Sequence, residues 1–279
     1  MQERLLDCLT EINRLRIVKI EKVTRESPSV KTFAFNDEWC STAEPGQFVM
    51  MWIPGVDEVP MSLSTIGQHG LSAVTVAEVG DATQALHQKT SGDLLGIRGP
   101  FGTGFSLVKG KTMVVGGGTG LAPLMPLVEA LVALDARITC LLGAKTKDEL
   151  LFLDRIKRTL SKVEGKIVTT TEDGSYGSAG VVTELAEKIL AKERFDIIYT
   201  CGKEQMMYKV FLLAGRHNTP LQASLERIMR CGIGLCGSCV VGEFMICKDG
   251  PVLSYDELLK ISDEFGKLKR DFSGREIPV

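Results

Sequence analysis

The stretch Thr112-Met-Val-Val-Gly-Gly-Gly-Thr-Gly120 decides the fold of this chain. A short apolar strand leads directly into a glycine-rich turn, and residues Leu121–Leu134 then have the pattern of a helix. Glycines let a pyrophosphate approach the main chain, and a helix N-terminus favours its negative charge. The pattern predicts a dinucleotide site at Gly118, Thr119 and Gly120. The strict G-x-G-x-x-G spacing is not met, so a tight turn without a ligand is the alternative.

Downstream of this turn, strand and helix patterns alternate. Strands are predicted at Arg137–Leu142, Lys166–Thr171 and Asp196–Thr200, and helices at Glu149–Leu160, Val181–Ala191 and Glu204–Gly215. Such alternation is typical of a parallel sheet with helices on both faces. We therefore expect an α/β nucleotide-binding domain over residues 106–222.

Upstream of the turn, the chain has a different character. Short β-rich runs are separated by Gly and Pro turns, with strands predicted at Arg16–Val23, Ser29–Phe35, Gly46–Ile53, Leu71–Val79 and Leu94–Arg98 and one helix within Asp81–Thr90. Several short strands at this spacing indicate an antiparallel β-barrel or sandwich. We assign residues 1–105 to this domain, with Met1–Arg16 as a short helix that leads into the first strand.

Four cysteines near the C-terminus have the spacing of a plant-type [2Fe–2S] site. Cys231, Cys236 and Cys239 form a C-x4-C-x2-C run, and Cys247 follows. Glycines between them allow the backbone to wrap tightly around an inorganic core. Zinc sites more often use two separated C-x2-C pairs, and a disulfide framework suits small secreted proteins. We therefore predict a [2Fe–2S] segment over residues 223–279, with an exposed charged tail from Asp256 onward.

Composition sets the broad class of protein. The chain has 279 residues, of which 44% are hydrophobic and 24% charged, and a net charge of −2. This balance gives no general attraction to nucleic acid or to acidic membranes. No apolar run is long enough to span a bilayer. The remaining cysteines are scattered, so we expect a protein of the reducing cytoplasm.

A nicotinamide and an iron–sulfur centre together imply a flavin. Nicotinamide delivers two electrons as a hydride, whereas the cluster accepts one, and a flavin can take two and release them singly. The barrel is the expected place for FAD. Candidate contacts follow two of its strands and its closing turn: Pro60, Met61, Ser62, Leu63 and Ser64; Ala77, Glu78, Val79, Gly80 and Thr83; and Gly99. Turn chemistry and helix capping explain the same residues without a ligand.

The order of these parts resembles the ferredoxin–NADP reductase superfamily and, within it, the iron–sulfur electron transfer subunits of dihydroorotate dehydrogenase B. The most specific stretches are Gly99-Pro-Phe-Gly, Gly116-Gly-Gly-Thr-Gly, Thr171-Glu-Asp-Gly-Ser-Tyr-Gly, Cys201-Gly and the cysteine run through Cys247-Lys-Asp-Gly-Pro. The resemblance implies FAD in the barrel, NAD at the α/β domain and a [2Fe–2S] cluster near the C-terminus. It also implies a partner, an FMN-containing catalytic subunit that oxidises dihydroorotate in pyrimidine synthesis, in a heterotetramer.

The resemblance also assigns roles to individual residues. Ser62 matches the position that contacts the flavin ring, and Gly80 and Thr83 match the flavin diphosphate loop. Cys201 and Gly202 match a pair near the nicotinamide, which makes Cys201 the candidate catalytic residue; a buried thiol is the alternative. The superfamily usually has an arginine just before the flavin serine, but Val59, Pro60 and Met61 stand there. Arg98 is a candidate replacement.

Three functions remain open at this stage. The leading one is the electron transfer subunit of dihydroorotate dehydrogenase. The second is the NAD(P)H-handling subunit of a soluble hydrogenase or of an NADPH:ferredoxin oxidoreductase, and the third is a redox sensor without turnover. The stretch Gly143-Ala-Lys-Thr-Lys-Asp-Glu149 has charges of both signs, so NADP is possible and NAD is favoured by the resemblance alone.

Overall fold

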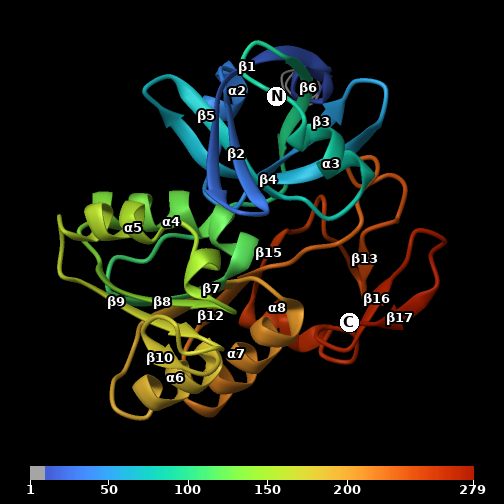
Figure 1. Ribbon diagram of the computed structural model, residues 1–279. Coiled ribbons are helices and arrows are strands. Elements are labelled where there is room, and N and C mark those ends of the chain that lie inside the picture. The colour runs from blue at the N-terminus through green and yellow to red at the C-terminus, as the bar shows by residue number, and fades with distance from the viewer. Residues whose placement is uncertain (1–9) are drawn as a thin grey trace.

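The computed structural model describes residues 10–279 and has three parts, a barrel, a layered α/β unit and a C-terminal segment (Figure 1). Part of the predicted N-terminal helix lies outside the described residues, and residues 10–13 are helical. The predicted antiparallel barrel and the α/β unit that follows it are confirmed.

Six strands form the closed barrel, in the order β1-β2-β5-β4-β3-β6, and every pairing is antiparallel. The strands are β1 (Arg16–Ser27), β2 (Val30–Phe35), β3 (Phe48–Ile53), β4 (Asp57–Gln68), β5 (Leu71–Ala77) and β6 (Leu94–Phe101), with short helices α2 (Glu38–Ser41) and α3 (Asp81–His87). Its core is filled by alternating inward residues such as Phe33, Phe35, Leu63 and Val74. Strand β4 was not predicted, and the segment Pro60–Ser64 lies inside it.

A seven-stranded sheet forms the centre of the α/β unit, in the order β10-β9-β8-β7-β11-β12-β15. Its strands are β7 (Lys111–Gly117), β8 (Arg137–Ala144), β9 (Gly165–Thr171), β10 (Ser178–Ala179), β11 (Ile197–Cys201), β12 (Leu221–Ser224) and β15 (Val252–Ser254). All neighbours are parallel except β15, which runs antiparallel beside β12. The predicted boundary at residue 222 therefore falls inside β12, and the chain returns to the sheet after the cysteine run.

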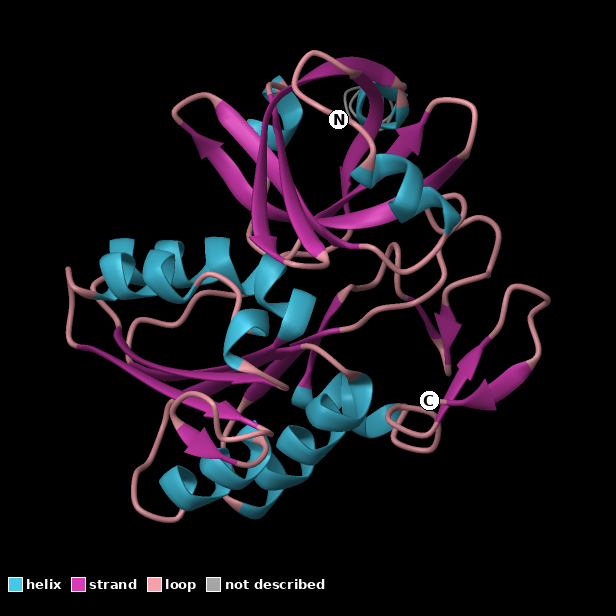
Figure 2. Ribbon diagram, viewed as in Figure 1, coloured by secondary structure: helices cyan, strands magenta, loops and turns pink. Residues whose placement is uncertain are grey.

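Helices cover both faces of this sheet (Figure 2). Helices α4 (Leu121–Ala133) and α5 (Leu153–Leu160) lie on the face toward the barrel, and α6 (Val182–Leu190) and α7 (Glu204–Arg216) lie on the other. The helix predicted at Glu149–Leu160 begins only at Leu153, after the short 3₁₀ turn η2 (Lys147–Glu149) and a left-handed Phe152. The other 3₁₀ turn, η1 (Gly118–Gly120), leads into α4.

The barrel is fastened to the α/β unit through β4 and two helices. Arg155 of α5 donates to the carbonyl of Ser64 and to the Thr65 hydroxyl at 3.0 Å each. The same guanidinium pairs with Glu129 of α4, which also accepts a hydrogen bond from Gln68 of the barrel. These bonds hold β4, with its candidate flavin residues, against the nucleotide-binding unit.

The residues from Glu226 to Pro251, here called the cluster segment, lie beside the barrel and carry the small hairpin β13 (Val240–Val241) and β14 (Phe244–Met245). The tail that follows was expected to be exposed, and that prediction is wrong for its first part. Helix α8 (Tyr255–Lys260) and the next turn bury Leu258, Ile261 and Phe265, whose spacing places them on one face. The chain ends in the hairpin β16 (Leu268–Arg270) and β17 (Glu276–Pro278).

Candidate functional site

The glycine-rich turn opens onto a cleft at the carboxyl ends of β7, β8, β9 and β11. The cleft has a volume of about 400 Å³, and its lining includes Gly118, Thr119, Gly120 and Gly202, which were predicted from sequence. Ligands of open α/β sheets bind at this edge. The structure therefore brings the predicted nucleotide residues together around one cavity.

Two glycines in the turn have different geometric requirements. Gly118 has φ +55°, and a Cβ placed there would meet nothing within 4 Å, so its backbone is open to a ligand. A Cβ on Gly120 would lie 2.4 Å from the Cα atom of Gly202, so the two loops are in direct backbone contact. The backbone at Gly118 is thus accessible to a pyrophosphate, while the contact between Gly120 and Gly202 fixes the shape of the turn.

Cys201 ends β11 just before Gly202, which lines the cleft, and is itself almost fully buried in the core. Burial, with a smaller contribution from the Glu226 carboxylate, raises the pKa of the Cys201 thiol well above its ordinary value. The thiol is therefore neutral, which fits a positioning or packing group better than a nucleophile.

Several charged residues of the cleft were not predicted. Lys145, Lys203, Lys209 and Glu226 line it together with Glu149, which lies in the stretch of mixed charge already noted. Glu226 keeps an exposed surface, but the protein around its carboxyl removes part of its water, and this desolvation, followed by the nearby Glu204, raises the pKa of Glu226. The sequence signal for Lys203 and Glu226 was their position just after strand ends, which are found at this edge of a parallel sheet.

The candidate flavin residues on β4 do not all face the same way. Pro60, Met61 and Ser62 are half-buried on the strand and remain accessible. Leu63 lies in the barrel core, and Ser64 is buried with its hydroxyl bonded to Ala73 and Thr75. In this structure the side chains of Leu63 and Ser64 are therefore not available to a ligand.

The loop after β5 is exposed at Glu78, Val79 and Gly80, whereas Ala77 is half-buried. The Thr83 hydroxyl accepts from the N–H groups of Val79 and Gly80 at 2.9 Å and donates to the Gly80 carbonyl. Thr83 thus caps helix α3, as the alternative interpretation expects.

Gly99 has φ +112°, and its carbonyl accepts from Arg16 at 2.7 Å. The candidate arginine, Arg98, binds Glu58, Asn13 and a carbonyl of the cluster segment. Its donors are committed, so the hypothesis that it replaces the diphosphate arginine has no support in this structure.

The four cysteines lie in one loop system whose main chain points at their sulfurs. The N–H of Gly234 donates to Cys247 Sγ at 3.2 Å, that of Leu235 to Cys231 Sγ at 3.3 Å and that of Cys247 to Cys239 Sγ at 3.4 Å. Donors of this kind stabilise thiolates and the sulfurs of a bound cluster. The loop glycines Gly232, Gly234 and Gly237 all have positive φ, as the predicted wrap requires.

The exposure of the four cysteines differs. Cys239 and Cys247 are buried, Cys231 is half-buried and Cys236 is exposed. The Ser238 hydroxyl and N–H lower the pKa of Cys236 to about 6, so this thiol readily takes the ligating thiolate form. Among residues 10–279, no three His, Cys, Asp or Glu side chains lie close enough together to hold a single metal ion. A two-iron centre is larger than a single ion, so its four cysteine ligands lie further apart.

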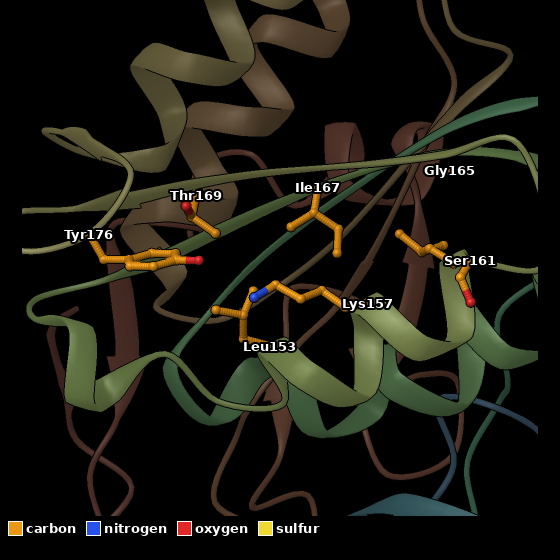
Figure 3. Close-up of a pocket in the computed structure, with 8 residues that line it drawn as sticks. Leu153, Lys157, Ser161, Gly165, Ile167, Thr169 and Tyr176 are labelled. Carbon is orange, nitrogen blue, oxygen red and sulfur yellow. The ribbon is translucent and has the colours of Figure 1, made fainter.

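A second cavity of about 280 Å³ lies between α5 and β9 (Figure 3). Leu153, Lys157 and Ser161 face it from the helix, and Ile167, Thr169 and Tyr176 face it from the strand side. Tyr176 lies in the stretch Thr171-Glu-Asp-Gly-Ser-Tyr-Gly noted in the sequence. The Thr171 hydroxyl holds this loop, because it donates to the Tyr176 carbonyl and accepts from the Tyr176 N–H. None of the predicted site residues lines this cavity.

None of the described helices combines the length and the apolar character needed to cross a bilayer.

Two family profiles match the parts recognised above. Residues 226–259 match the iron–sulfur cluster binding domain of dihydroorotate dehydrogenase B, and residues 114–211 match the oxidoreductase NAD-binding domain. The predicted iron–sulfur and NAD-binding regions are thus confirmed.

Comparisons over the whole chain give the same family. A Methanocaldococcus jannaschii protein named as a probable dihydroorotate dehydrogenase B (NAD(+)) electron transfer subunit is 45% identical over 94% of this chain and 97% of its own. A Methanothermobacter thermautotrophicus protein of the same name is 40% identical over 97% and 100%. A solved structure described as an NADH-dependent reduced ferredoxin–NADP oxidoreductase has a TM-score of 0.78 and 31% identity, and covers 89% of this chain and 94% of its own. The chain therefore belongs to the electron transfer subunits of dihydroorotate dehydrogenase B, within the ferredoxin reductase-like oxidoreductases.

Proposed function

We propose that this subunit exchanges electrons between NAD in the cleft, FAD on the barrel and a [2Fe–2S] cluster held by Cys231, Cys236, Cys239 and Cys247. One observation carries this proposal: the cluster segment packs directly on β3, the strand next to β4, and on β6 beyond it. Phe48, Met50 and Phe101 of the barrel share a buried core with Cys239, Cys247 and Ile246. The cluster ligands and the candidate flavin strand are thereby parts of one rigid assembly.

The residues of the chain fit these groups. The open backbone at Gly118 and the lysines of the cleft suit a dinucleotide pyrophosphate. Pro60 and Ser62 share the outer face of β4, whereas Met61 packs against the barrel core. The Arg155 contacts to Ser64 and Thr65, further along the same strand, hold β4 beside the nucleotide-binding unit. A bound flavin accepts two electrons as a hydride and releases them singly, and an iron–sulfur cluster carries one at a time. The chain itself binds and orients these groups, and the buried neutral Cys201 packs in the core next to Gly202, which lines the cleft.

The partner would be an FMN-containing catalytic subunit that oxidises dihydroorotate, in a heterotetramer. The name of the curated relatives, electron transfer subunit, supports a separate catalytic partner. The exposed edge of the cluster segment is the place for it, because Leu235 next to Cys236 is 79% exposed. The C-terminal hairpin extends that edge: Phe272 is 75% exposed and lines, with Cys236 and Ser238, a cavity of about 440 Å³.

The hairpin is anchored, so it can contribute to a docking surface. Arg230 donates to the Phe272 carbonyl at 2.8 Å, and Gln205 donates to the Val279 carbonyl at 3.1 Å. We expect Leu235→Ser combined with Phe272→Ser to weaken the complex with the catalytic subunit and to leave the iron content unchanged. Leu134→Ser, on an exposed site after α4, is the control. Unchanged affinity in the double variant would exclude this edge as the docking surface.

A second candidate is the reductase subunit of an NADPH:ferredoxin oxidoreductase, which the 31% identical solved structure favours. Purification with the native partners, followed by analysis for FAD, FMN, iron and sulfide, separates the two. The main proposal predicts an FMN-containing partner with dihydroorotate-dependent reduction of NAD. NADH or NADPH should also bleach the flavin and cluster absorbance of this subunit, and a lack of bleaching by both would support a non-catalytic role instead.

A further inference from the structure

Arg98 of β6 makes four hydrogen bonds to three residues, and one of these bonds joins the barrel to the cluster segment. Its Nε and Nη2 atoms donate to the two carboxylate oxygens of Glu58 at 2.8 and 2.6 Å. Its Nη1 atom donates to Asn13 Oδ1 at 2.5 Å and to the main-chain carbonyl of Cys231 at 3.2 Å. The guanidinium also lies 5.7 Å from the centre of the Phe101 ring. All of these contacts are largely shielded, because the Arg98 side chain is only 16% exposed.

The residue after Cys231 is in close contact with the same part of the barrel. A Cβ on Gly232 would lie 2.9 Å from Met50 Cγ and 3.2 Å from the Phe101 ring. The loop therefore rests on β3 and β6 with no space for a side chain. The far end of the cluster segment is held separately, since Thr103 N–H donates to the Gly250 carbonyl at 2.6 Å. Arg98 thus controls the Cys231 end of the segment.

We propose that Arg98 is a positioning residue that holds Cys231 and its loop against the barrel, and so sets the separation between the cluster and the flavin-binding strands. This inference rests on the proposed function for the identity of the two cofactors. The clamp, meaning the bonds of Arg98 to Glu58, Asn13 and Cys231, does not depend on the cofactors, because these hydrogen bonds join parts of this chain alone.

The geometry assigns this role to the shape of the guanidinium and not to its charge. Glu58 neutralises Arg98, so the pair adds little net field at the cysteines. A bidentate bond to Glu58, combined with further bonds to Asn13 and Cys231, needs the planar set of donors that arginine has and lysine lacks. Arg98→Lys keeps the charge and loses this set, so it separates the two explanations.

The test compares the full-length Arg98→Lys subunit with the wild type and with Arg25→Lys. Arg25 is a matched control, because it also lies in the barrel and donates to two main-chain carbonyls, those of Ser27 and Pro28, away from the cluster segment. The first measurement is amide hydrogen exchange at residues 232–235. We expect exchange to rise about tenfold in Arg98→Lys, the effect of losing one or two charge-assisted hydrogen bonds, and not in Arg25→Lys.

The second measurement is the rate at which the flavin and then the cluster are reduced after rapid mixing with NADH, in the subunit that holds both groups. We expect flavin reduction in Arg98→Lys to match the wild type, and the following reduction of the cluster to be slower than in the wild type, because the Cys231 loop is no longer held at one distance from the barrel. Asn13→Ala removes one bond of the clamp, and it provides a milder variant with a smaller change in the same direction if Arg98→Lys does not fold. Wild-type exchange and wild-type cluster reduction in Arg98→Lys would overturn the proposal. If the wild-type subunit itself holds no iron or flavin, the proposed function fails, and the exchange result still decides whether the clamp exists.

Discussion

Gly120 of the nucleotide turn and Gly202 at the end of β11 are in direct backbone contact, since a Cβ on Gly120 would lie 2.4 Å from both the Cα and the N atoms of Gly202. Gly202 has φ +150°, a conformation that side chains disfavour. The two loops beside the cleft can therefore approach this closely only because both positions are glycine. This contact joins the dinucleotide turn to the Cys201-Gly202 pair.

Gly120→Ala should disturb both the stability of the fold and the cleft. The added methyl meets main-chain atoms that cannot rotate away, and overpacking of this kind costs about 1–3 kcal/mol. We expect a lower midpoint of thermal unfolding and weaker NADH binding, measured by calorimetry and by fluorescence titration. An alanine variant with wild-type stability and affinity would contradict the close contact.

Gly118→Leu should weaken nicotinamide nucleotide binding and leave the iron–sulfur centre intact. The new side chain would project from an open backbone into the cleft, and its positive φ adds a strain of about 1–2 kcal/mol. Gly70→Leu is the matched control, because Gly70 has φ +79° and open space but lies in the β4–β5 turn. NADH affinity should fall in Gly118→Leu alone. An equal loss in both variants would assign the effect to strain.

Cys236→Ser should remove or destabilise the cluster while the flavin stays bound. Serine replaces a thiolate ligand by a poor one, and Cys236 lies on the exposed side of its loop, where the loss does not disturb the core. Iron and sulfide analysis with the visible spectrum measures the outcome. Cys140→Ala, at a buried cysteine of β8, should keep the full cluster. A Cys236→Ser protein with two irons and two sulfides would refute the ligand assignment.

Asp37 should make the stability of the barrel depend on acid pH. Burial alone would raise the pKa of this carboxyl, but bonds from Arg16 and from the Cys40 N–H outweigh it and hold the pKa below its ordinary value. The stabilisation is therefore present above the unfolded pKa of about 3.9 and is lost as the pH falls through the lower folded value.

Asp37→Asn tests this dependence. At neutral pH it should cost about 1–3 kcal/mol, because Arg16 loses its charged partner. The difference from the wild type should shrink as the pH falls below about 4. Denaturant unfolding at several pH values gives the comparison, and a constant difference down to the lowest pH would contradict it.

Local spacing in the sequence accounts for where the glycines of the turn and of the cysteine loop lie. The glycines at Gly118 and Gly120 lie beside the cleft, and the glycines of the cysteine loop have the positive φ that its wrap requires. Strand β4 was missed because Pro60 within it is more typical of a turn than of a strand, although Val59, Met61 and Leu63 do alternate with non-core residues. The buried positions of the tail were missed because charged residues surround Leu258, Ile261 and Phe265 in the sequence.

The sequence by itself determined the antiparallel β part, the α/β unit and the cysteine motif, because each is encoded by short-range periodicity and spacing. Only the tertiary structure decided how these parts meet. Arg98 is bound to Glu58 and to the carbonyl of Cys231, 133 positions further along the chain, and is therefore not free to bind a diphosphate. Gly120 similarly contacts Gly202. Contacts between residues distant in sequence depend on the packing of whole elements, and no local pattern in one sequence records them.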